Sequence, residues 1–256
     1  MFSLAALSLL ALVLVNGTNA SNSKRGLAFA DNTNPTDISV AENTEVSWVY
    51  DWGTTPASYI ASSGLPYIPM QWGTSGVESF AATVTSQGAK TILGFNEPDL
   101  SSQSNVDPST AASLWTQYIQ PLKAQGVTLG APAVTNGPTG IPWLQQFLGN
   151  CSSCDIDFVP LHWYGEGVSN FESYVEQFHS TFPSYPLWVT EFASTSTNST
   201  DVETFLTAVL TWLDAQSYIT GYAWFALFRD DGTSYYSLLN SSGQPNALGT
   251  SYFTQA

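Results

Sequence analysis

Short apolar runs recur along the chain from residue 26 onward, separated by polar connections or by segments with helical periodicity. Most of these runs are continuously apolar rather than alternating, which is typical of parallel strands that are buried on both faces. The pattern predicts eight strands, at Gly26–Ala30, Val46–Asp51, Pro66–Met70, Thr91–Asn96, Thr128–Ala133, Asp157–Trp163, Leu187–Phe192 and Gly221–Phe228.

Apolar residues at helical spacing fill several of the connections between the later runs. Gly88 is a plausible C-cap for one helix, and Asp107 followed by Pro108 is a favourable start for another. The early connections are short, so the first helices are expected to be abbreviated. The pattern predicts helices at Val77–Gln87, Ser109–Gln125, Phe171–Phe182 and Asp201–Gln216.

Strands that alternate with helices predict an α/β fold, and eight such units fit a compact (β/α)8 TIM-type barrel with short early helices. The barrel would occupy residues 26–256 as a single domain. A doubly wound open sheet is the alternative, but no G-x-G-x-x-G or Walker sequence follows the first strand. In a barrel, catalytic residues lie at the carboxyl ends of the strands.

The first residues have the features of a secretory signal peptide. Leu4–Val15 is apolar apart from Ser8, too short at about 12 residues to span a bilayer. Thr18-Asn19-Ala20 resembles a cleavage site, so we predict a signal peptide at residues 1–20 and a secreted protein; a buried N-terminal helix is the alternative. Lys24-Arg25 offers a second processing position, which would remove residues 1–25 and start the mature chain at Gly26.

Charge excludes several classes of partner. Five Lys and Arg face 20 Asp and Glu, for a formal net charge of -15, so nucleic acid and anionic membrane surfaces are disfavoured. Only 10% of residues are charged while 14% are aromatic, which is too apolar for a disordered acidic chain. A neutral partner and a monomeric protein are expected.

Cys151 and Cys154 are the only cysteines, and in a secreted chain we expect them to form a local disulfide. With no second cysteine pair, a structural zinc site is improbable, and neither a metal nor an organic cofactor is implied. The N-x-S/T sequences at Asn150, Asn198 and Asn240 are candidate glycosylation sites.

Two glutamates follow apolar strands, at opposite positions of the predicted barrel. The fourth strand ends Leu93-Gly94-Phe95-Asn96-Glu97-Pro98-Asp99, and the seventh ends Trp188-Val189-Thr190-Glu191-Phe192. The chain has few cations to pair with them, so a pair of rim salt bridges is the weaker interpretation. Two carboxylates at one mouth are what glycoside hydrolysis requires.

The string Gly94-Phe95-Asn96-Glu97-Pro98-Asp99, with the later Trp188-Val189-Thr190-Glu191-Phe192, resembles glycoside hydrolase family 128, β-1,3-glucanases of clan A. The resemblance extends from about Gly26 to the C-terminus. It implies a retaining endo-β-1,3-glucanase acting on β-glucan, with Glu97 as acid/base, Glu191 as nucleophile and Asn96 binding the sugar 2-hydroxyl. A clan A β-glycanase of other linkage specificity, or a non-catalytic cell-wall glucan-binding protein, remain alternatives.

Further candidates lie at the ends of other strands. His162 and Tyr164 share one face of the sixth strand by alternation, so Tyr164 is expected to donate to the nucleophile and His162 to a sugar or a carboxylate. Clan A enzymes often place a tryptophan from the eighth strand beneath the sugar, which points to Trp224. Other candidates are the sugar-stacking tryptophans Trp52, Trp72 and Trp163, the lower-ranked polar residues Asp51, Gln71 and Asn136, and Asp99 as a structural residue of its turn.

Overall fold

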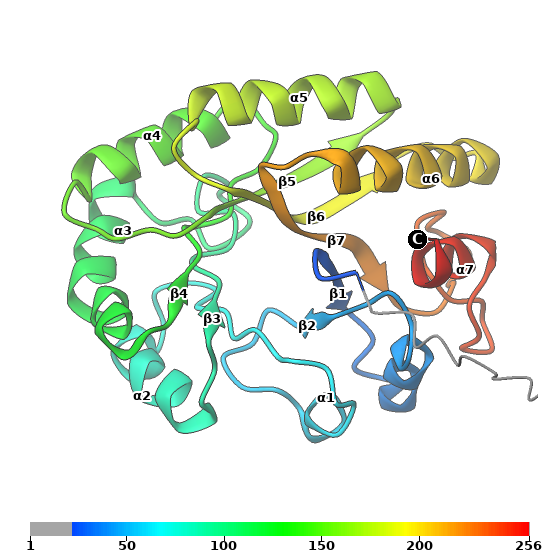
Figure 1. Ribbon diagram of the computed structural model, residues 1–256, viewed down its shortest axis with the longest axis horizontal. Helices are drawn as coiled ribbons and strands as arrows, with labels where there is room; N and C mark the ends of the chain where they lie inside the picture. Colours follow the sequence, from blue (N-terminus) through cyan, green and yellow to red (C-terminus); the bar gives the residue numbers. More distant parts are fainter. Residues whose placement is uncertain (1–21, 256) are drawn as a thin grey trace, which may run out of the picture.

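Parallel strands form the centre of the structure, and helices surround them (Figure 1). The computed structural model describes residues 22–255, so the signal peptide predicted at residues 1–20 lies outside the described residues. Within the described range, no helix is both long enough and apolar enough to cross a membrane.

The strands belong to two hydrogen-bonded sets. The larger has the order β2-β1-β7-β6-β5, and the smaller pairs β3 with β4; every neighbouring pair is parallel. Their bounds are β1 Arg25–Phe29, β2 Trp48–Tyr50, β3 Thr91–Ile92, β4 Thr128–Leu129, β5 Val159–Gly165, β6 Leu187–Ser194 and β7 Ile219–Leu227.

Isolated bridges join the two sets into a closed ring. Residues 66–70, predicted as the third strand, appear only as bridges, with Tyr67 paired to Val49 and Met70 paired to Leu93. On the other side, β4 reaches β5 through the Gly130–Phe158 bridge, and Val134–Leu161 extends the contact. The ring therefore has eight positions, and the TIM-type barrel is confirmed.

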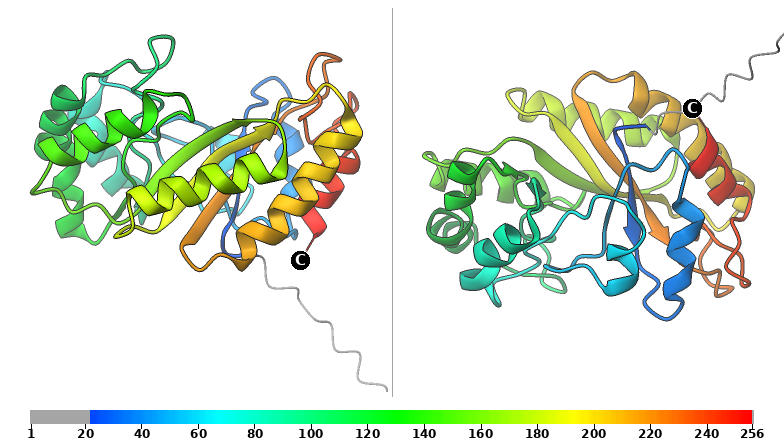
Figure 2. Two further views of the ribbon diagram at one scale, coloured as in Figure 1. Left: turned by 90° about the horizontal axis from the view of Figure 1, so that it is seen from above. Right: turned by 60° about the horizontal axis from the view of Figure 1, so that its bottom comes forward.

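Helices cover the outside of the ring (Figure 2). The early ones are abbreviated, as predicted: a 3-10 turn η1 at Pro35–Ala41 and the single turn α1 at Ser58–Ala61. The later ones are α2 Val77–Gln87, α3 Pro108–Leu114, α4 Gly140–Asn150, α5 Val168–Thr181, α6 Ser199–Ala215 and α7 Ala247–Thr254. The sequence pattern did not predict α4 or α7.

The helix predicted at residues 109–125 is three segments instead of one. α3 is followed by a π-helical turn η2 at Trp115–Ile119 and a 3-10 segment η3 at Gln120–Gln125. Pro121 explains the change, because it lacks an N–H and its ring crowds the preceding turn. The predicted start is confirmed, since the Asp107 side chain accepts hydrogen bonds from the backbone of Ser109 and Thr110.

Two tryptophans fill the amino end of the barrel. The Trp48 and Trp188 rings lie 4.9 Å apart between centroids. Each ring lies against a glycine: a Cβ at Gly26 would come within 2.2 Å of Trp48, and one at Gly221 within 2.3 Å of Trp188. The missing side chains at the two glycines make room for the two rings, which fill the amino end of the barrel. A cleft can then form at the carboxyl end.

Lys24 and Arg25 are part of this folded domain. Lys24 Nζ donates to the carbonyls of Leu213, Asp214 and Gln216 at the end of α6. Arg25 is 0% exposed, and its guanidinium donates to the carbonyl of Tyr252 in α7 and lies 3.4 Å from Asp214 Oδ2. A mature start at Gly26 would remove both anchors, whereas cleavage after residue 20 would keep them.

Candidate active site

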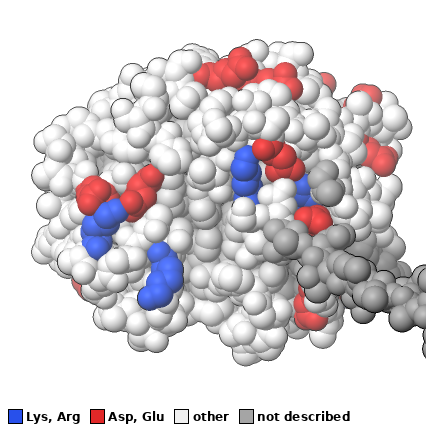
Figure 3. Space-filling view, viewed as in Figure 1, with Lys and Arg blue, Asp and Glu red and all other residues white. Residues whose placement is uncertain are grey.

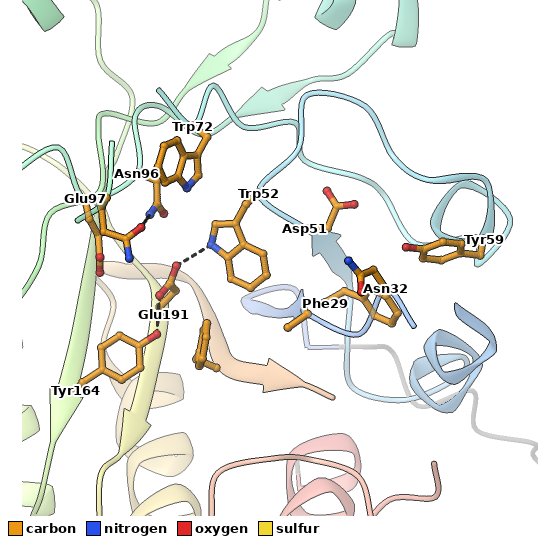
Figure 4. A pocket seen from close by; sticks show the side chains of 13 residues that line it. Phe29, Asn32, Asp51, Trp52, Tyr59, Trp72, Asn96, Glu97, Tyr164 and Glu191 are labelled. Carbon is orange, nitrogen blue, oxygen red and sulfur yellow. Dashed lines mark hydrogen bonds between the residues drawn. The ribbon is translucent and has the colours of Figure 1, made fainter. Parts of the chain in front are cut away.

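A cleft opens at the carboxyl ends of the strands (Figure 4). Its volume is about 630 Å³, and both predicted catalytic glutamates line it. Side chains from β1, β5, β6, β7, the turn α1 and the loops after β1, β2, residue 70 and residue 92 contribute to its walls. The lining residues are Phe29, Ala30, Asn32, Asp51, Trp52, Tyr59, Trp72, Asn96, Glu97, Gln103, Tyr164, Glu191 and Phe225.

Glu97 sits in a turn that follows β3. Its φ of 43° is in the left-handed region, and its N–H donates to the carbonyl of Ala133 at 2.8 Å. Asp99 secures the same turn by accepting hydrogen bonds from the backbone N–H and hydroxyl of Thr135 and the hydroxyl of Thr139. Asp99 is therefore a structural residue, in the role the sequence indicated.

Glu191 lies within β6, and donors surround its carboxylate. Tyr164 donates its hydroxyl to Oε2 at 2.5 Å, and Trp52 donates its indole N–H to Oε1 at 2.8 Å. Tyr164 therefore contacts the predicted nucleophile as expected. Trp52 does more than the sequence suggested, because its polar edge binds the carboxylate while its ring lines the cleft.

His162 stands between the two glutamates and is fully buried. Its Nδ1 shares a hydrogen bond with Glu97 Oε1 at 2.8 Å, and its Nε2 lies 3.4 Å from Glu191 Oε1. Burial opposes a charge on the imidazole, but Glu191 and Glu97 outweigh it and raise the pKa of His162 above its ordinary value. The register of β5 and β6, which pairs His162 with Glu191, builds this contact.

The two carboxylates are close enough to act on one bond. An oxygen of Glu97, a nitrogen of His162 and an oxygen of Glu191 lie within 4.8 Å of one another. These are also the donor types that a divalent metal uses, and they form the one such cluster in the described part of the chain. The hydrogen bond between His162 Nδ1 and Glu97 Oε1 already uses two of these three potential metal ligands, so the arrangement suits proton transfer.

Hydrogen bonds with Asn136 fix the backbone of Tyr164. Its backbone N–H donates to the side chain of Asn136, which in turn donates to the Tyr164 carbonyl. Burial raises the pKa of the Tyr164 phenol, and the charge of Glu191 raises it further, so the hydroxyl remains a donor. Asn136, a lower-ranked sugar-binding candidate, is thus a support for Tyr164.

Several polar and aromatic candidates face the cleft. The buried Oδ1 atom of Asn96 has no hydrogen-bond partner among the described residues, which fits an acceptor kept for a sugar hydroxyl. Trp72 is 40% exposed at the rim and offers a ring for stacking. Gln71 instead supports the loop of Trp72, since its amide donates to the carbonyls of Gly73 and Ser75.

Two predicted binding tryptophans lie outside the cleft, which corrects the sequence interpretation. Trp163 is 3% exposed and stacks on Phe205 of α6. Trp224 is 0% exposed, and its indole N–H donates to the carbonyl of Tyr236. Both point outward from the barrel toward the helices and loops, because successive strand residues face opposite sides.

Phe225 takes the place in the cleft that was predicted for Trp224. Its ring packs edge-on against Trp52 at 5.8 Å and against Tyr164 at 5.5 Å between centroids. Alternation along β7 was the signal that could have found it. Phe29, Asn32, Tyr59 and Gln103 also line the cleft without having been predicted. Asn32 and Gln103 lie in loops, where sequence periodicity gives no signal.

The remaining predicted sites lie away from the cleft. Cys151 and Cys154 form the expected disulfide. Asn150 and Asn198 are exposed, and Asn198 caps α6 by accepting from the backbone of Thr200. Asn240 is partly buried in a turn, where its side chain accepts from the backbone of Ser242 and Gln244.

No lysine or arginine lines the cleft in the described part of the chain. Few charged side chains appear on the face shown in Figure 3, where most of the surface belongs to uncharged residues. A polyanionic ligand would find no counter-charge at this site, whereas a neutral ligand rich in hydroxyls would find aromatic rings and polar groups.

Comparison with known proteins agrees with this geometry. The family described as Glycosyl hydrolase catalytic core matches residues 26–252. Alkali-sensitive linkage protein 1 of Schizosaccharomyces pombe is 35% identical over 246 residues, which cover 90% of this chain. The aligned region is 44% of that protein, so the chain spans less than half the length of this curated relative.

Solved structures give the same result. A curdlan-specific exo-β-1,3-glucanase of glycoside hydrolase family 128 from Blastomyces gilchristii is 34% identical, with a TM-score of 0.81 and coverage of 92% of this chain and 99% of that one. An endo-β-1,3-glucanase of the same family from Amycolatopsis mediterranei, in complex with laminaritriose, is 30% identical, with a TM-score of 0.74 and coverage of 90% and 98%. The chain belongs to the glycosyl hydrolase catalytic core family, and its resemblance to family 128 is confirmed.

Proposed function

We propose that the chain is a secreted, retaining endo-β-1,3-glucanase. The observation that carries this proposal is the pair Glu97 and Glu191, which face one cleft with carboxylate oxygens within 4.8 Å. Carboxyl groups of retaining enzymes are about 5–5.5 Å apart, whereas inverting enzymes leave about 6.5–9.5 Å for a water. The short separation therefore favours double displacement.

The surroundings of the two carboxylates divide their roles. Glu191 accepts hydrogen bonds on both oxygens, which hold its carboxylate in place as the nucleophile that attacks the anomeric carbon. Glu97 contacts only His162 among the described side chains, and it would give its proton to the leaving oxygen. In the second step Glu97 takes a proton from the water that releases the sugar from Glu191.

β-1,3-Glucan is the proposed substrate because relatives from several organisms act on it. The Amycolatopsis enzyme binds laminaritriose, and the Blastomyces enzyme is specific for curdlan. The cleft of this chain also has the uncharged, aromatic character that a neutral glucan needs.

Endo action is proposed from the shape of the cleft walls. The connections after β5 and β6 are only residues 166–167 and 195–198, so this side carries no insertion that would close one end. Secretion is proposed from the predicted signal peptide, and a disulfide is in keeping with an oxidising compartment.

Hydrolysis of a panel of soluble β-glucans tests the activity and the site. We expect cleavage of β-1,3-glucan by the unmodified protein and a loss of at least about 10³-fold for Glu97→Gln and Glu191→Gln. NMR of the first product should show the β-anomer. Wild-type rates in both variants would overturn the site, and cleavage of β-1,4-glucan alone would indicate another linkage specificity. Glucan binding without cleavage would indicate a binding protein.

Product size tests the mode of attack. An endo enzyme lowers the viscosity of a long glucan before many reducing ends appear, and it releases oligosaccharides of several lengths. Release of glucose from the outset, with little change in viscosity, would show that the chain acts from the end like the Blastomyces relative.

A further inference from the structure

Trp52 has an unusual position at the end of β2. Its φ of 60° is in the left-handed region, which is uncommon for a bulky residue and costs free energy. The turn that holds it is fixed by Asp51, whose Oδ1 accepts from the N–H of Gly53 and from the hydroxyl of Tyr67. The fold therefore maintains an unfavourable backbone in order to place this indole.

The indole is aimed at the predicted nucleophile. Its Nε1 lies 2.8 Å from Glu191 Oε1, and its ring packs against Tyr50 at 5.0 Å and edge-on against Phe225 at 5.8 Å between centroids. In Figure 4 the Trp52 side chain lies between Glu191 and the part of the cleft that contains Asp51 and Asn32. One face of the ring is thus available to a bound sugar.

The one group beside Glu191 that can carry a positive charge is His162, whose Nε2 lies 3.4 Å from Oε1. The cleft lining of the described chain contains no lysine or arginine, and the titratable groups that face Glu191 are Glu97, His162, Tyr164 and Tyr50. Tyr164 donates its hydroxyl to Oε2 of Glu191, while Tyr50 donates instead to the carbonyl of Thr190. Trp52 is consequently the one hydrogen-bond donor on Oε1 among the described side chains.

We propose that Trp52 is a positioning residue for the nucleophile, and that its indole N–H holds the Glu191 carboxylate in the orientation for attack. This proposal rests on the proposed function of Glu191. An indole N–H neither titrates nor carries a charge, so it holds the carboxylate at any working pH without attracting anions into the cleft.

The same ring connects substrate binding to the nucleophile. A sugar lying on Trp52 would exclude water from the hydrogen bond between Nε1 and Oε1, and hydrogen bonds strengthen when the local dielectric constant falls. Trp52 would then hold Glu191 most firmly when substrate is present.

Replacing the same residue type at two places in the cleft tests the proposal. Trp52→Phe removes the N–H but keeps an aromatic ring, and the control Trp72→Phe makes the same change in a ring that hydrogen-bonds to neither glutamate. For Trp52→Phe on a laminari-oligosaccharide we expect kcat to fall about 10- to 100-fold, the effect of losing a hydrogen bond to a charged group. Trp72→Phe should change mainly KM.

Each outcome decides the matter. A Trp52→Phe variant that keeps kcat, or changes only KM as Trp72→Phe does, would overturn the proposal. Thermal unfolding of both variants separates misfolding from a local effect, because an unchanged melting temperature assigns any loss in kcat to the missing N–H. If the unmodified protein cleaves no glucan, the proposed function itself fails. If it cleaves glucan but Trp52→Phe does not lower kcat, only the role proposed for Trp52 fails.

Discussion

His162 shows how one buried side chain connects stability with chemistry. Its two nitrogens face the two glutamates, at 2.8 and 3.4 Å, and no water reaches them from the cleft because the residue is fully buried. The carboxyl groups of Glu97 and Glu191 therefore act on one imidazole. The pKa of His162 is raised because Glu191 and Glu97 favour the charged imidazole more than burial disfavours it.

This residue makes the stability of the fold depend on pH. Because the folded-state pKa of His162 lies above its ordinary value near 6.5, its contribution is fully present below pH 6.5 and is lost as pH rises through the folded-state pKa. We expect the melting temperature to fall as the pH rises above about 6.5. In His162→Gln this fall should be smaller, as thermal unfolding at a series of pH values would show. Equal slopes for both proteins would contradict the prediction.

The sequence could predict the site only as far as strand ends could be located. Glu97 and Glu191 were found because each follows an apolar run, and a barrel brings the ends of such runs to one mouth. Trp163 and Trp224 were misplaced, because an uncertainty of one residue in a strand reverses the face of every side chain. The hydrogen bond from Trp52 to Glu191 joins residues far apart in the chain, so no local pattern contains it.

At the scale of elements, Asp99 joins the loop after β3 to the loop after β4. Its three hydrogen bonds end on Thr135 and Thr139, and Glu97 lies two residues earlier in the same turn. The position of the predicted acid/base therefore depends on a connection between two loops, which the Asp99 side chain adds to the single backbone bridge between Asn96 and Ala133.

Asp99→Asn should displace that turn while leaving the cleft walls in place. The amide can keep an acceptor for one Thr135 contact but presents a donor where the second oxygen accepted two hydroxyls. We expect kcat on β-1,3-glucan to fall about 10-fold, equivalent to about 1.4 kcal/mol. KM should change little. The Thr139→Val variant, which removes one of the three bonds, should lie between Asp99→Asn and the unmodified protein; an effect confined to KM would contradict this role.

The elements themselves were predictable to different extents. Long strands such as β5, β6 and β7 coincide with apolar runs, whereas the run at residues 66–70 forms only bridges and Thr91–Asn96 pairs as a two-residue strand. Two prolines, Pro66 and Pro69, explain the first case, since proline donates no ladder hydrogen bond. α4 has glycine and proline near its start, which obscured its helical pattern.

At the scale of the whole molecule, the N-terminal anchors decide where the folded protein can begin. Arg25 reaches α7 and Asp214, and Lys24 covers the last carbonyls of α6, so β1 joins the two ends of the chain. We expect the mature protein to retain Lys24 and Arg25, which intact-mass measurement would show directly. Arg25→Ala should lower the free energy of unfolding by about 3 kcal/mol, because it removes one partner of a buried pair. A mature mass that starts at Gly26 would contradict the first expectation.

The barrel is unequal around its circumference, and the two proposed catalytic glutamates lie on different halves. Glu191 is within β6, which pairs along its length with β5 and β7. Glu97 follows β3, which pairs over two residues with β4 and meets residues 66–70 through one bridge.

Sheet hydrogen bonds set the free energy of local opening, so hydrogen exchange should be at least about tenfold faster for amides of residues 66–70 and 91–97 than for β6. A bound laminari-oligosaccharide would contact both halves, and the added binding energy should slow exchange more at 91–97 than at 187–194, because only the first segment opens easily without ligand. Equal exchange in the two segments, with and without ligand, would show instead that the helices outside the ring hold both halves as one cooperative unit.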